Sequence, residues 1–167
     1  RVPRVLTAFL AGAALSISGM TFQALFRNPL ATPFTLGVSS TAAFGAALYV
    51  RLGIGFSLAA VDGQAVSAFL GALAALGIVY GLTRMRRGFS TATMLLAGVA
   101  VSFFFSSFLL FVQYTSDFSN SFRIIRWLMG GLEGVGYRPV LMVRPTTVAG
   151  AAGVLFLVRE LNLISFG

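Results

Sequence analysis

The sequence predicts an all-α protein of the polytopic membrane class, built as a bundle of about five membrane-spanning helices. Hydrophobic residues make up 57% of the chain and charged residues only 10%, whereas a soluble domain carries about 25% charged residues. Charged residues also divide the chain into uncharged stretches long enough to cross a hydrocarbon core of about 30 Å. A soluble protein would need polar helix faces, which these stretches lack.

Four uncharged stretches and a fifth that contains one arginine are the expected spans, and typical helix-ending residues bound several of them. Arg27-Asn28-Pro29 ends the first stretch, Pro33 begins the second, and the arginines at 84–87 end the third. The expected spans are Val5–Phe26, Phe34–Val50, Gln64–Thr83, Phe89–Ser116 and Val140–Val158. The connector Arg51–Gly63 is glycine-rich and mildly apolar, as suits an interfacial loop.

The fifth span is interrupted by Arg144 and Pro145. Two alternatives follow for this segment. Either Arg144 extends its charged end to the membrane interface while the helix continues, or the span begins only after Pro145.

The connector Asp117–Arg138 contains a short helical pattern. A serine or asparagine at 119–121 is the expected cap, and Gly130-Gly131 the expected end. Arg123 and Arg126 lie three residues apart on the more polar side of this helix. Its expected apolar face consists of Phe122, Ile125, Leu128 and Met129. Such a helix lies along the membrane surface or enters a cavity, and does not span.

Small residues recur at four-residue spacing within the spans. In lipid, helices associate through close backbone packing, which small residues permit. The sets are Gly37/Thr41/Gly45, Gly77/Gly81 and Gly98/Ser102/Ser106. They predict a tightly packed helix bundle rather than separate anchors.

The residue inventory excludes most catalytic chemistry. The chain has no Cys and no His, which removes thiol nucleophiles and the commonest metal ligand and general base. Because Lys is also absent, no Walker A loop can form, so nucleotide energy would have to come from a partner. All four carboxylates lie in connectors or at ends, which argues against an ion-coupled carrier. A membrane enzyme that uses Ser or Asp is the remaining catalytic alternative.

The net charge of +8 comes entirely from arginine. Because the arginines are scattered between apolar spans, basic membrane loops explain them better than nucleic-acid binding. Alternating connectors give one side Arg1, Arg4, Arg51, Arg123, Arg126, Arg138 and Arg144, and the other side Arg27, Arg84, Arg86, Arg87 and Arg159. A simple count favours the first side as cytoplasmic and the compact cluster favours the second, so charge alone leaves the orientation open.

An ordered set of motifs covers essentially the whole chain. They are Arg1-Val-Pro-Arg4, Ala11–Gly19, Gln23–Ala31, Leu36–Ser40, Ser90-Thr91, Leu95–Ala100, Trp127–Gly131 and Leu161–Gly167. Together they resemble the FecCD-type permeases of bacterial ABC importers, which carry iron–siderophore complexes, haem or cobalamin. Any one of these motifs is weak evidence, whereas their order along the chain is strong evidence.

The resemblance implies an architecture and a set of partners. A permease of this type has about ten spanning helices, of which residues 1–167 resemble helices two to six, the N-terminal half of a single membrane domain. It forms a homodimer in the bacterial inner membrane, with cytoplasmic ABC ATPase subunits and a periplasmic or lipid-anchored substrate-binding protein. The chain itself needs no cofactor, because ATP is bound by the ATPase. The element that couples to the ATPase follows a motif like Leu161–Gly167, so the chain reads as a fragment.

The resemblance also implies roles for particular residues. Arg1 and Arg4 would lie on the periplasmic side and meet acidic residues of the binding protein, the alternative being ordinary interfacial anchors. Ser90 and Thr91 would form the cytoplasmic gate, although Ser90 is equally suited to cap a helix. The expected pathway-lining residues are Gly98, Ser102 and Ser106, and the expected periplasmic helix carries Arg123, Arg126 and Trp127. The rival function is a small structural or assembly membrane protein without transport activity.

Overall fold

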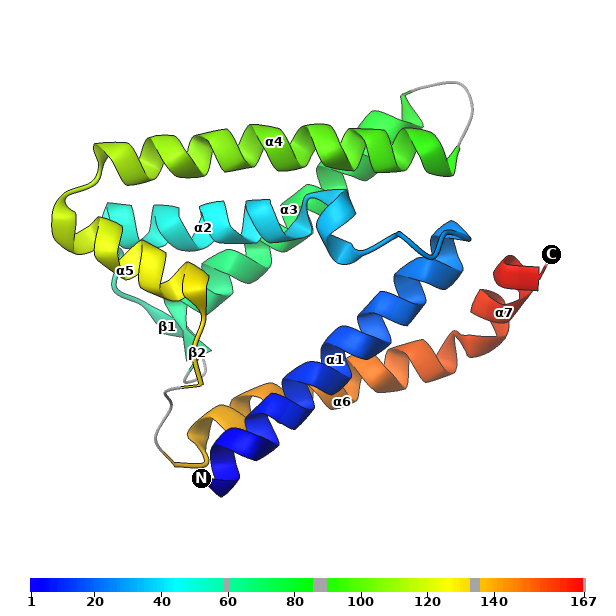
Figure 1. Ribbon diagram of the computed structural model, residues 1–167, viewed down its shortest axis with the longest axis horizontal. Coiled ribbons are helices and arrows are strands. Elements are labelled where there is room, and N and C mark those ends of the chain that lie inside the picture. The colour runs from blue at the N-terminus through cyan, green and yellow to red at the C-terminus, as the bar shows by residue number, and fades with distance from the viewer. Residues whose placement is uncertain (59–60, 86–89, 133–135, 167) are drawn as a thin grey trace. The chain divides into compact units, whose positions relative to one another are not determined.

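The computed structural model describes residues 1–58, 61–85, 90–132 and 136–166 (Figure 1). The chain folds into two compact units. Unit 1 comprises Arg1–Thr32 and Gly131–Gly167, and unit 2 comprises Pro33–Gly130. Each unit is helical, as the sequence predicts, apart from one short hairpin in unit 2.

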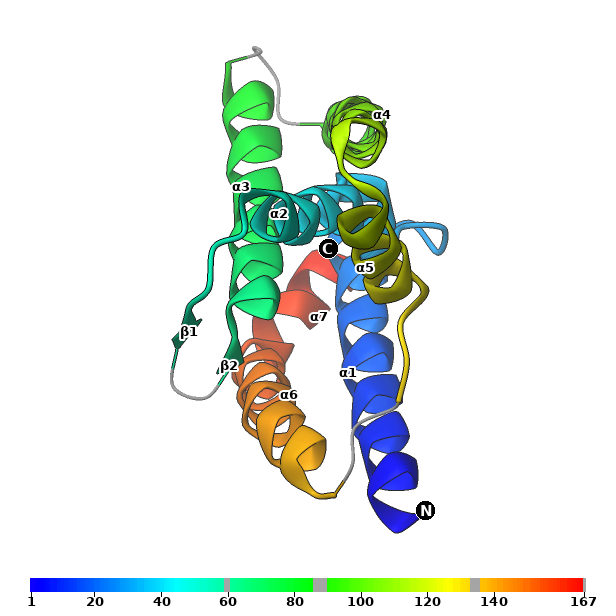
Figure 2. The same cartoon turned by 90° about the vertical axis from the view of Figure 1, so that its left-hand side faces the viewer.

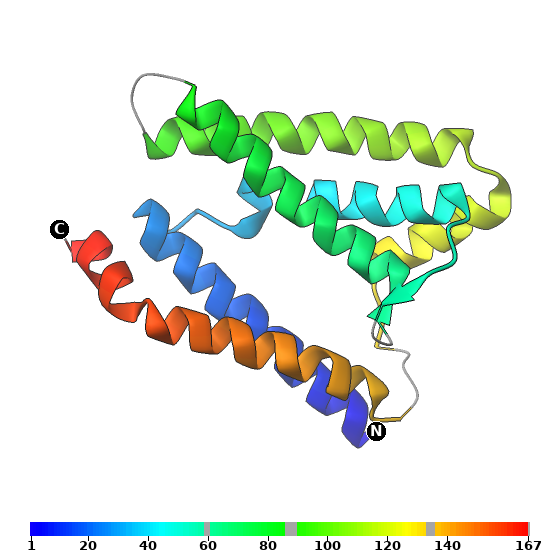
Figure 3. The ribbon, with the colours of Figure 1, turned by 180° about the vertical axis from the view of Figure 1, so that it is seen from behind.

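Unit 1 is built on two parallel helices, α1 (Val2–Phe26) and α6 (Arg138–Phe156), which lie side by side (Figure 3). Arg4 and Pro139, near the two helix starts, line one cavity, while Ser18 and Val154, farther along, line another. Because early residues of α1 meet early residues of α6, both helices run in the same direction.

The end of α1 is fixed by a hydrogen-bonded turn. The amides of Arg27 and Asn28 donate to the carbonyls of Ala24 and Gln23 at 3.3 and 3.2 Å, with Arg27 in the left-handed region at φ 48°. This is a Schellman end. The Gln23 side chain then donates to the carbonyl of Pro29 at 2.9 Å, and the Asn28 side chain accepts from the amide of Leu30 at 2.9 Å. The motif around Arg27 is therefore a rigid turn.

The helix α6 continues through Pro145, and the whole of Arg138–Phe156 is long and apolar enough to cross, which favours the alternative in which the helix continues past Arg144. Pro145 has no N–H to donate to the carbonyl one turn earlier, which normally weakens a helix. The hydroxyls of Thr146 and Thr147 both donate to the carbonyl of Val143, at 2.8 and 2.9 Å, so they add hydrogen bonds beside Pro145 without replacing the missing bond to the carbonyl of Leu141. The span ends at Phe156, two residues before the expected Val158, and a separate helix, α7 (Val158–Phe166), follows it.

In unit 2, α2 (Val38–Leu52) packs against α3 (Gly63–Arg84), which crosses it at an angle (Figure 2) and runs in the opposite direction. A Cβ placed on Gly45 would lie 2.5 Å from the carbonyl oxygen of Ser67, and one placed on Gly71 would collide with the carbonyl of Thr41. The two backbones therefore touch at two points one helix turn or more apart. Only glycine permits this approach.

The helix α2 also packs against α4 (Thr91–Thr115), which runs parallel to it. A short 3-10 turn, η1 (Pro33–Leu36), precedes α2 and meets α4 at Gly98, where a Cβ would collide with the carbonyl of Thr35. Gly37 has φ 76°, and a Cβ there would lie 2.9 Å from Cγ1 of Val101. The predicted small-residue contacts at Gly37, Gly45 and Gly98 are thus confirmed.

The predicted contact at Gly77/Gly81 is not made within the described part of the chain. A Cβ on either glycine of this α3 pair would meet no atom within 4 Å. Four-residue spacing alone cannot distinguish a glycine that faces a helix from one that faces outward, because both faces have the same period.

A buried cluster joins α2, α4 and the short helix α5 (Phe118–Met129). Its members are Ala47, Val50, Val112 and Ile124, with Ile124 only 1% exposed. The expected cap at 119–121 is wrong, because Asp117 precedes the first residue of α5; the predicted end at Gly130 is confirmed. Ile124 rather than the expected apolar face makes the buried contact, and the expected face remains exposed.

The connector between α2 and α3 contains an antiparallel hairpin of β1 (Ser57–Leu58) and β2 (Val61–Asp62). Ser57 pairs with Asp62, and Leu58 with Val61. The hydroxyl of Tyr49 donates to the carbonyl of Phe56 at 3.0 Å and accepts from its amide at 3.3 Å, which ties the connector to the end of α2.

Five crossings follow from the direction of the helices. Within the described residues, α1, α3, α4 and α6 are long and apolar enough to cross a membrane, whereas α2 has only 15 residues. Two parallel spans must be separated by an odd number of crossings, and α1 and α6 are parallel. Because α3 and α4 supply only two crossings between α1 and α6, one more segment must cross. The short helix α5, with 12 residues, reaches only about 18 Å, so the segment formed by η1 and α2, Pro33–Leu52, is the additional crossing.

Candidate functional site

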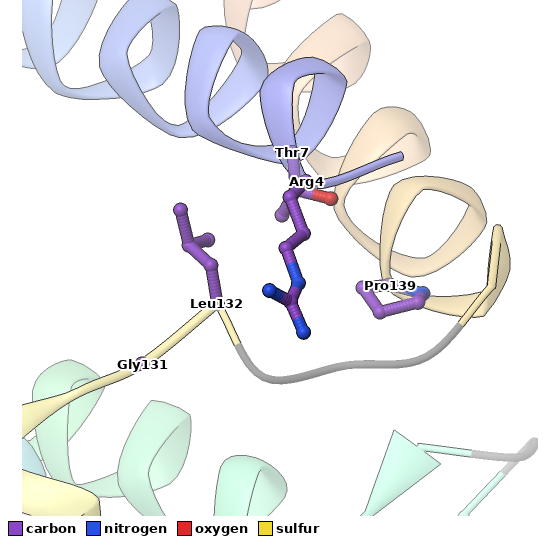
Figure 4. Close-up of a pocket in the computed structure, with 5 residues that line it drawn as sticks. All are labelled: Arg4, Thr7, Gly131, Leu132 and Pro139. Carbon is purple, nitrogen blue, oxygen red and sulfur yellow. The ribbon is translucent and has the colours of Figure 1, made fainter. Parts of the chain in front are cut away.

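The starts of α1 and α6 form a cavity of about 170 Å³ in unit 1. Arg4, Thr7, Gly131, Leu132 and Pro139 line it. Figure 4 shows the Arg4 side chain extending between Leu132 and Pro139. Thr7 is buried, and its hydroxyl donates to the carbonyl of Pro3 at 2.9 Å, so its proton is used within α1. The guanidinium is consequently the main hydrogen-bond donor that the cavity offers to a ligand.

This end of unit 1 is electropositive for two reasons. The N-terminal ends of both parallel helices lie there, and neither helix has an acidic residue in its first turn. Neither Arg1 nor Tyr137, the residues at the two N-caps, makes a side-chain capping bond. Arg1 and Arg4 are both exposed, and among the described residues no ion pair neutralises Arg4. The arrangement suits a carboxylate or another anion brought by a partner.

Ser90 and Thr91 stand at the start of α4, and the structure gives Ser90 a capping role. Its hydroxyl accepts from the amide of Thr93 at 3.1 Å and lies 2.8 Å from the Thr93 hydroxyl. Thr91 is exposed as the first residue of the helix. A role of the pair as a gate stays a prediction, and Phe89, the expected start of this span, lies outside the described residues.

The three residues expected to line a pathway differ in their surroundings. Gly98 is buried against η1. The hydroxyl of Ser102 donates to the carbonyl of Phe34 at 3.4 Å, which makes Ser102 part of the same contact. Ser106 is partly exposed, one turn farther along α4. The first two thus hold η1 in place, and pathway lining by any of the three stays a prediction.

The helix α5 presents Arg123, Arg126 and Trp127 on its exposed surface, while Ile124 fixes it to the core of unit 2. A second contact holds its start, since the hydroxyl of Ser121 donates to the carbonyl of Gln113 at 2.9 Å. The helix is therefore held against both α2 and α4. Its place on the periplasmic side stays a prediction.

The sequence reasoning missed the residues that complete the Arg4 cavity. Thr7, Leu132 and Pro139 come from two segments far apart in the sequence. One sequence signal for the start of α6 was available. Arg138-Pro139 begins α6 in the same way as Val2-Pro3 begins α1, with a proline in the first turn of the helix.

The comparison with family models gives a match to the FecCD transport family over residues 1–167. Curated relatives agree over the whole length of this chain. The chain is 37% identical to an uncharacterised ABC transporter permease protein, YvrB, of Bacillus subtilis, and covers 47% of its length. It is 39% identical to the cobalamin import system permease protein BtuC of Halobacterium salinarum, covering 44%, and 36% identical to the hemin transport system permease protein HmuU of Yersinia pestis, covering 50%.

A solved structure matches the fold as well. It is reported as an inward-facing conformation of a transporter assigned to the metal-chelate ABC type, with a TM-score of 0.86 and 33% sequence identity. The match covers 100% of this chain and 52% of that one. The chain thus spans about half the length of the relatives it matches. Because the family match extends from the first residue to the last, the chain belongs to the FecCD transport family.

Proposed function

We propose that this chain forms part of the translocation pathway in the permease subunit of a binding-protein-dependent ABC importer. The cargo would be a ferric siderophore or a related metal chelate such as haem or cobalamin. The observation that carries the proposal is the match of the entire chain to half of an ABC transporter chain, with a TM-score of 0.86. The names of the cobalamin and hemin permeases support the cargo class.

The proposal assigns energy and recognition to partners. The chain has no lysine and therefore no Walker A loop, which supports assigning ATP hydrolysis to a separate ATPase subunit. The chain also has no His or Cys, the ligands that would compete with a chelator for a transition metal. A pathway of this composition lets a chelated metal pass intact. A second copy of the permease would complete the pathway as a homodimer.

The arginine-bearing end of unit 1 is proposed to face the periplasm of a bacterial inner membrane. The support is electrostatic: the Arg4 cavity lies where two helix N-terminal ends add to the charge of Arg1 and Arg4. Acidic side chains of a substrate-binding protein would be steered to such a surface. Because four crossings separate Arg4 from the connector after α4, α5 would lie on the same side of the membrane and Ser90 on the cytoplasmic side.

Reconstituted transport tests this function. The full-length permease that carries residues 1–167 is placed in liposomes with its ATPase and supplied with binding proteins loaded with cobalamin, hemin or ferric siderophore. The proposal predicts ATP-dependent accumulation of one cargo. The control is the same preparation with an ATPase whose Walker A lysine is replaced by alanine. The proposal is wrong if no cargo accumulates and no loaded binding protein stimulates ATP hydrolysis, and the structural or assembly role would then be favoured.

A further inference from the structure

The helix α6 has a weak point at Pro145. Because proline has no amide hydrogen, the carbonyl of Leu141, one turn earlier, receives no backbone hydrogen bond from this position. The hydroxyls of the two threonines that follow both bond to the carbonyl of Val143, a pattern that itself favours bending of a helix. Within α6, all of which the structure describes, no residue is buried. A bend at Pro145 therefore does not have to disrupt a core of unit 1.

A groove of about 120 Å³ lies between α6 and α1, directly beyond this weak point. The residues that line it on α6 all follow the proline, and they are Thr146, Thr147, Gly150, Ala151 and Val154. On the side of α1 it is lined by Ala14, Ile17 and Ser18. Most of these side chains are small. The second half of α6 therefore has free space on the side that faces α1.

The proline stands on the opposite side of α6 from this groove. At 3.6 residues per turn, Pro145 lies about 170° around the helix from the mean direction of the groove-lining residues. It is exposed, as expected for a residue on the side away from α1. The clash between a proline ring and the carbonyl one turn earlier opens a helix on the proline side, and so bends the helix toward the other side. For α6 that other side is the groove.

We infer that Pro145 is a hinge at which the second half of α6 moves into and out of the α1–α6 groove during the transport cycle. The inference rests on the proposed function, because an importer has to alternate between two arrangements of its helices. The first half of α6 stays beside α1 at the Arg4 cavity, which Pro139 lines. The second half leads into α7 and carries it along. Because the element that couples to the ATPase is expected after α7, the hinge links ATP binding to the spacing of α1 and α6.

Distances between spin labels on introduced cysteines test the hinge. The full-length permease and its ATPase are placed in lipid nanodiscs, either free of nucleotide or trapped with ATP and vanadate. Labelled copies are diluted with unlabelled ones, so that only distances within one chain are read. One label pair lies beyond the hinge, at Met20 and Leu155, and a control pair lies before it, at Val5 and Leu141; all four side chains are exposed. The inference predicts that the Met20–Leu155 distance differs by several ångströms between the two states and that the control distance does not change.

Two substitutions in α6 separate a hinge from general damage. Pro145→Ala restores the amide donor, so it should abolish the distance change and lower ATP-dependent uptake severalfold, while the melting temperature stays equal or rises. Val148→Ala is the matched control, because it shortens an exposed side chain of the same helix and should leave all three quantities near the parent values. Equal Met20–Leu155 distances in the two states, or a change that survives Pro145→Ala, would overturn the inference. An equal change in the control pair would do so too, since α6 would then move as a rigid body.

Hydrogen exchange reads the hinge without transport. In the full-length permease alone, the amides of residues 146–151 are expected to exchange severalfold faster than in Pro145→Ala, and at the same rate as in Val148→Ala. Failed transport together with this exchange pattern rejects only the proposed importer. Working transport together with equal exchange in the parent and in Pro145→Ala rejects only the hinge.

Discussion

The Cα of Gly98 lies against the carbonyl of Thr35, at the point where the turn before α2 meets α4. A Cβ on Gly98 would also lie 2.6 Å from the Cα of Leu36. Because both neighbours are backbone atoms, they cannot move aside to make room for a side chain. This contact holds the turn before α2 against α4.

Gly98→Ala is therefore expected to destabilise the protein by about 1–3 kcal/mol, the usual cost of overpacking. Thermal unfolding of the purified permease measures the effect. Gly77→Ala is the matched control, because a Cβ there meets nothing within 4 Å. Equal melting temperatures for the two variants would mean that η1 and α4 do not touch at Gly98.

Ile124→Ala is expected to release α5 from the core of unit 2. The buried side chain contacts the cluster of Ala47, Val50 and Val112, and truncating such a residue costs about 2–5 kcal/mol. Hydrogen exchange of the α5 amides should become much faster than in the parent. Phe122→Ala removes an exposed side chain of the same helix and should leave exchange nearly unchanged. Protection that survives Ile124→Ala would show that another contact holds α5.

Substitutions at Ser90 separate a cap from a gate. Ser90→Ala removes the acceptor for the amide of Thr93 and should cost about 1 kcal/mol of stability. Ser90→Asp keeps an acceptor and should restore that stability. If the residue only caps α4, transport recovers with stability. If it also forms the gate, the added charge impairs transport although the melting temperature is restored. Recovery of both quantities would remove Ser90 from the gate.

Charge reversal at the arginine-bearing end tests docking. Arg1→Glu and Arg4→Glu are each expected to lower the affinity of the permease for the substrate-binding protein by about fivefold, or roughly 1 kcal/mol. The loss should be larger at low salt, because the charges are then screened less. Arg51→Glu applies the same charge change at the end of α2, which the proposed topology places on the same side of the membrane. An equal loss for Arg51→Glu would indicate a general charge effect instead of docking at the Arg4 cavity.

The sequence predicts the spans well because uncharged stretches have a direct physical meaning in lipid. Charged residues end α1 and α3 close to the expected positions. Pro145 was less informative, since a helix can either end at a proline or continue past it with one backbone hydrogen bond fewer, and α6 continues. The buried contact of Ile124 could not be predicted from the sequence either, because an amphipathic pattern does not say which side of a short helix meets protein and which meets lipid.

For the candidate site, sequence motifs indicate single residues but not their surroundings. Arg4 stands in a recognisable motif, whereas its cavity depends on Leu132 and Pro139, more than a hundred residues away along the chain. Such a site requires knowledge that α1 and α6 are parallel neighbours, which spacing within either helix cannot supply.

The central claim, that the chain crosses the membrane five times, is tested most directly by finding on which side of the membrane each end of α2 lies. Residues 1–167 contain no cysteine, so single cysteines can be introduced at Leu30, before α2, and at Ile54, after it, with any cysteine elsewhere replaced. Both side chains are exposed. With a membrane-impermeant maleimide, the account predicts that Ile54→Cys reacts in intact spheroplasts and Leu30→Cys only in inside-out vesicles. Reaction of both from the same side would show that α2 does not cross, and would contradict the five-span pathway.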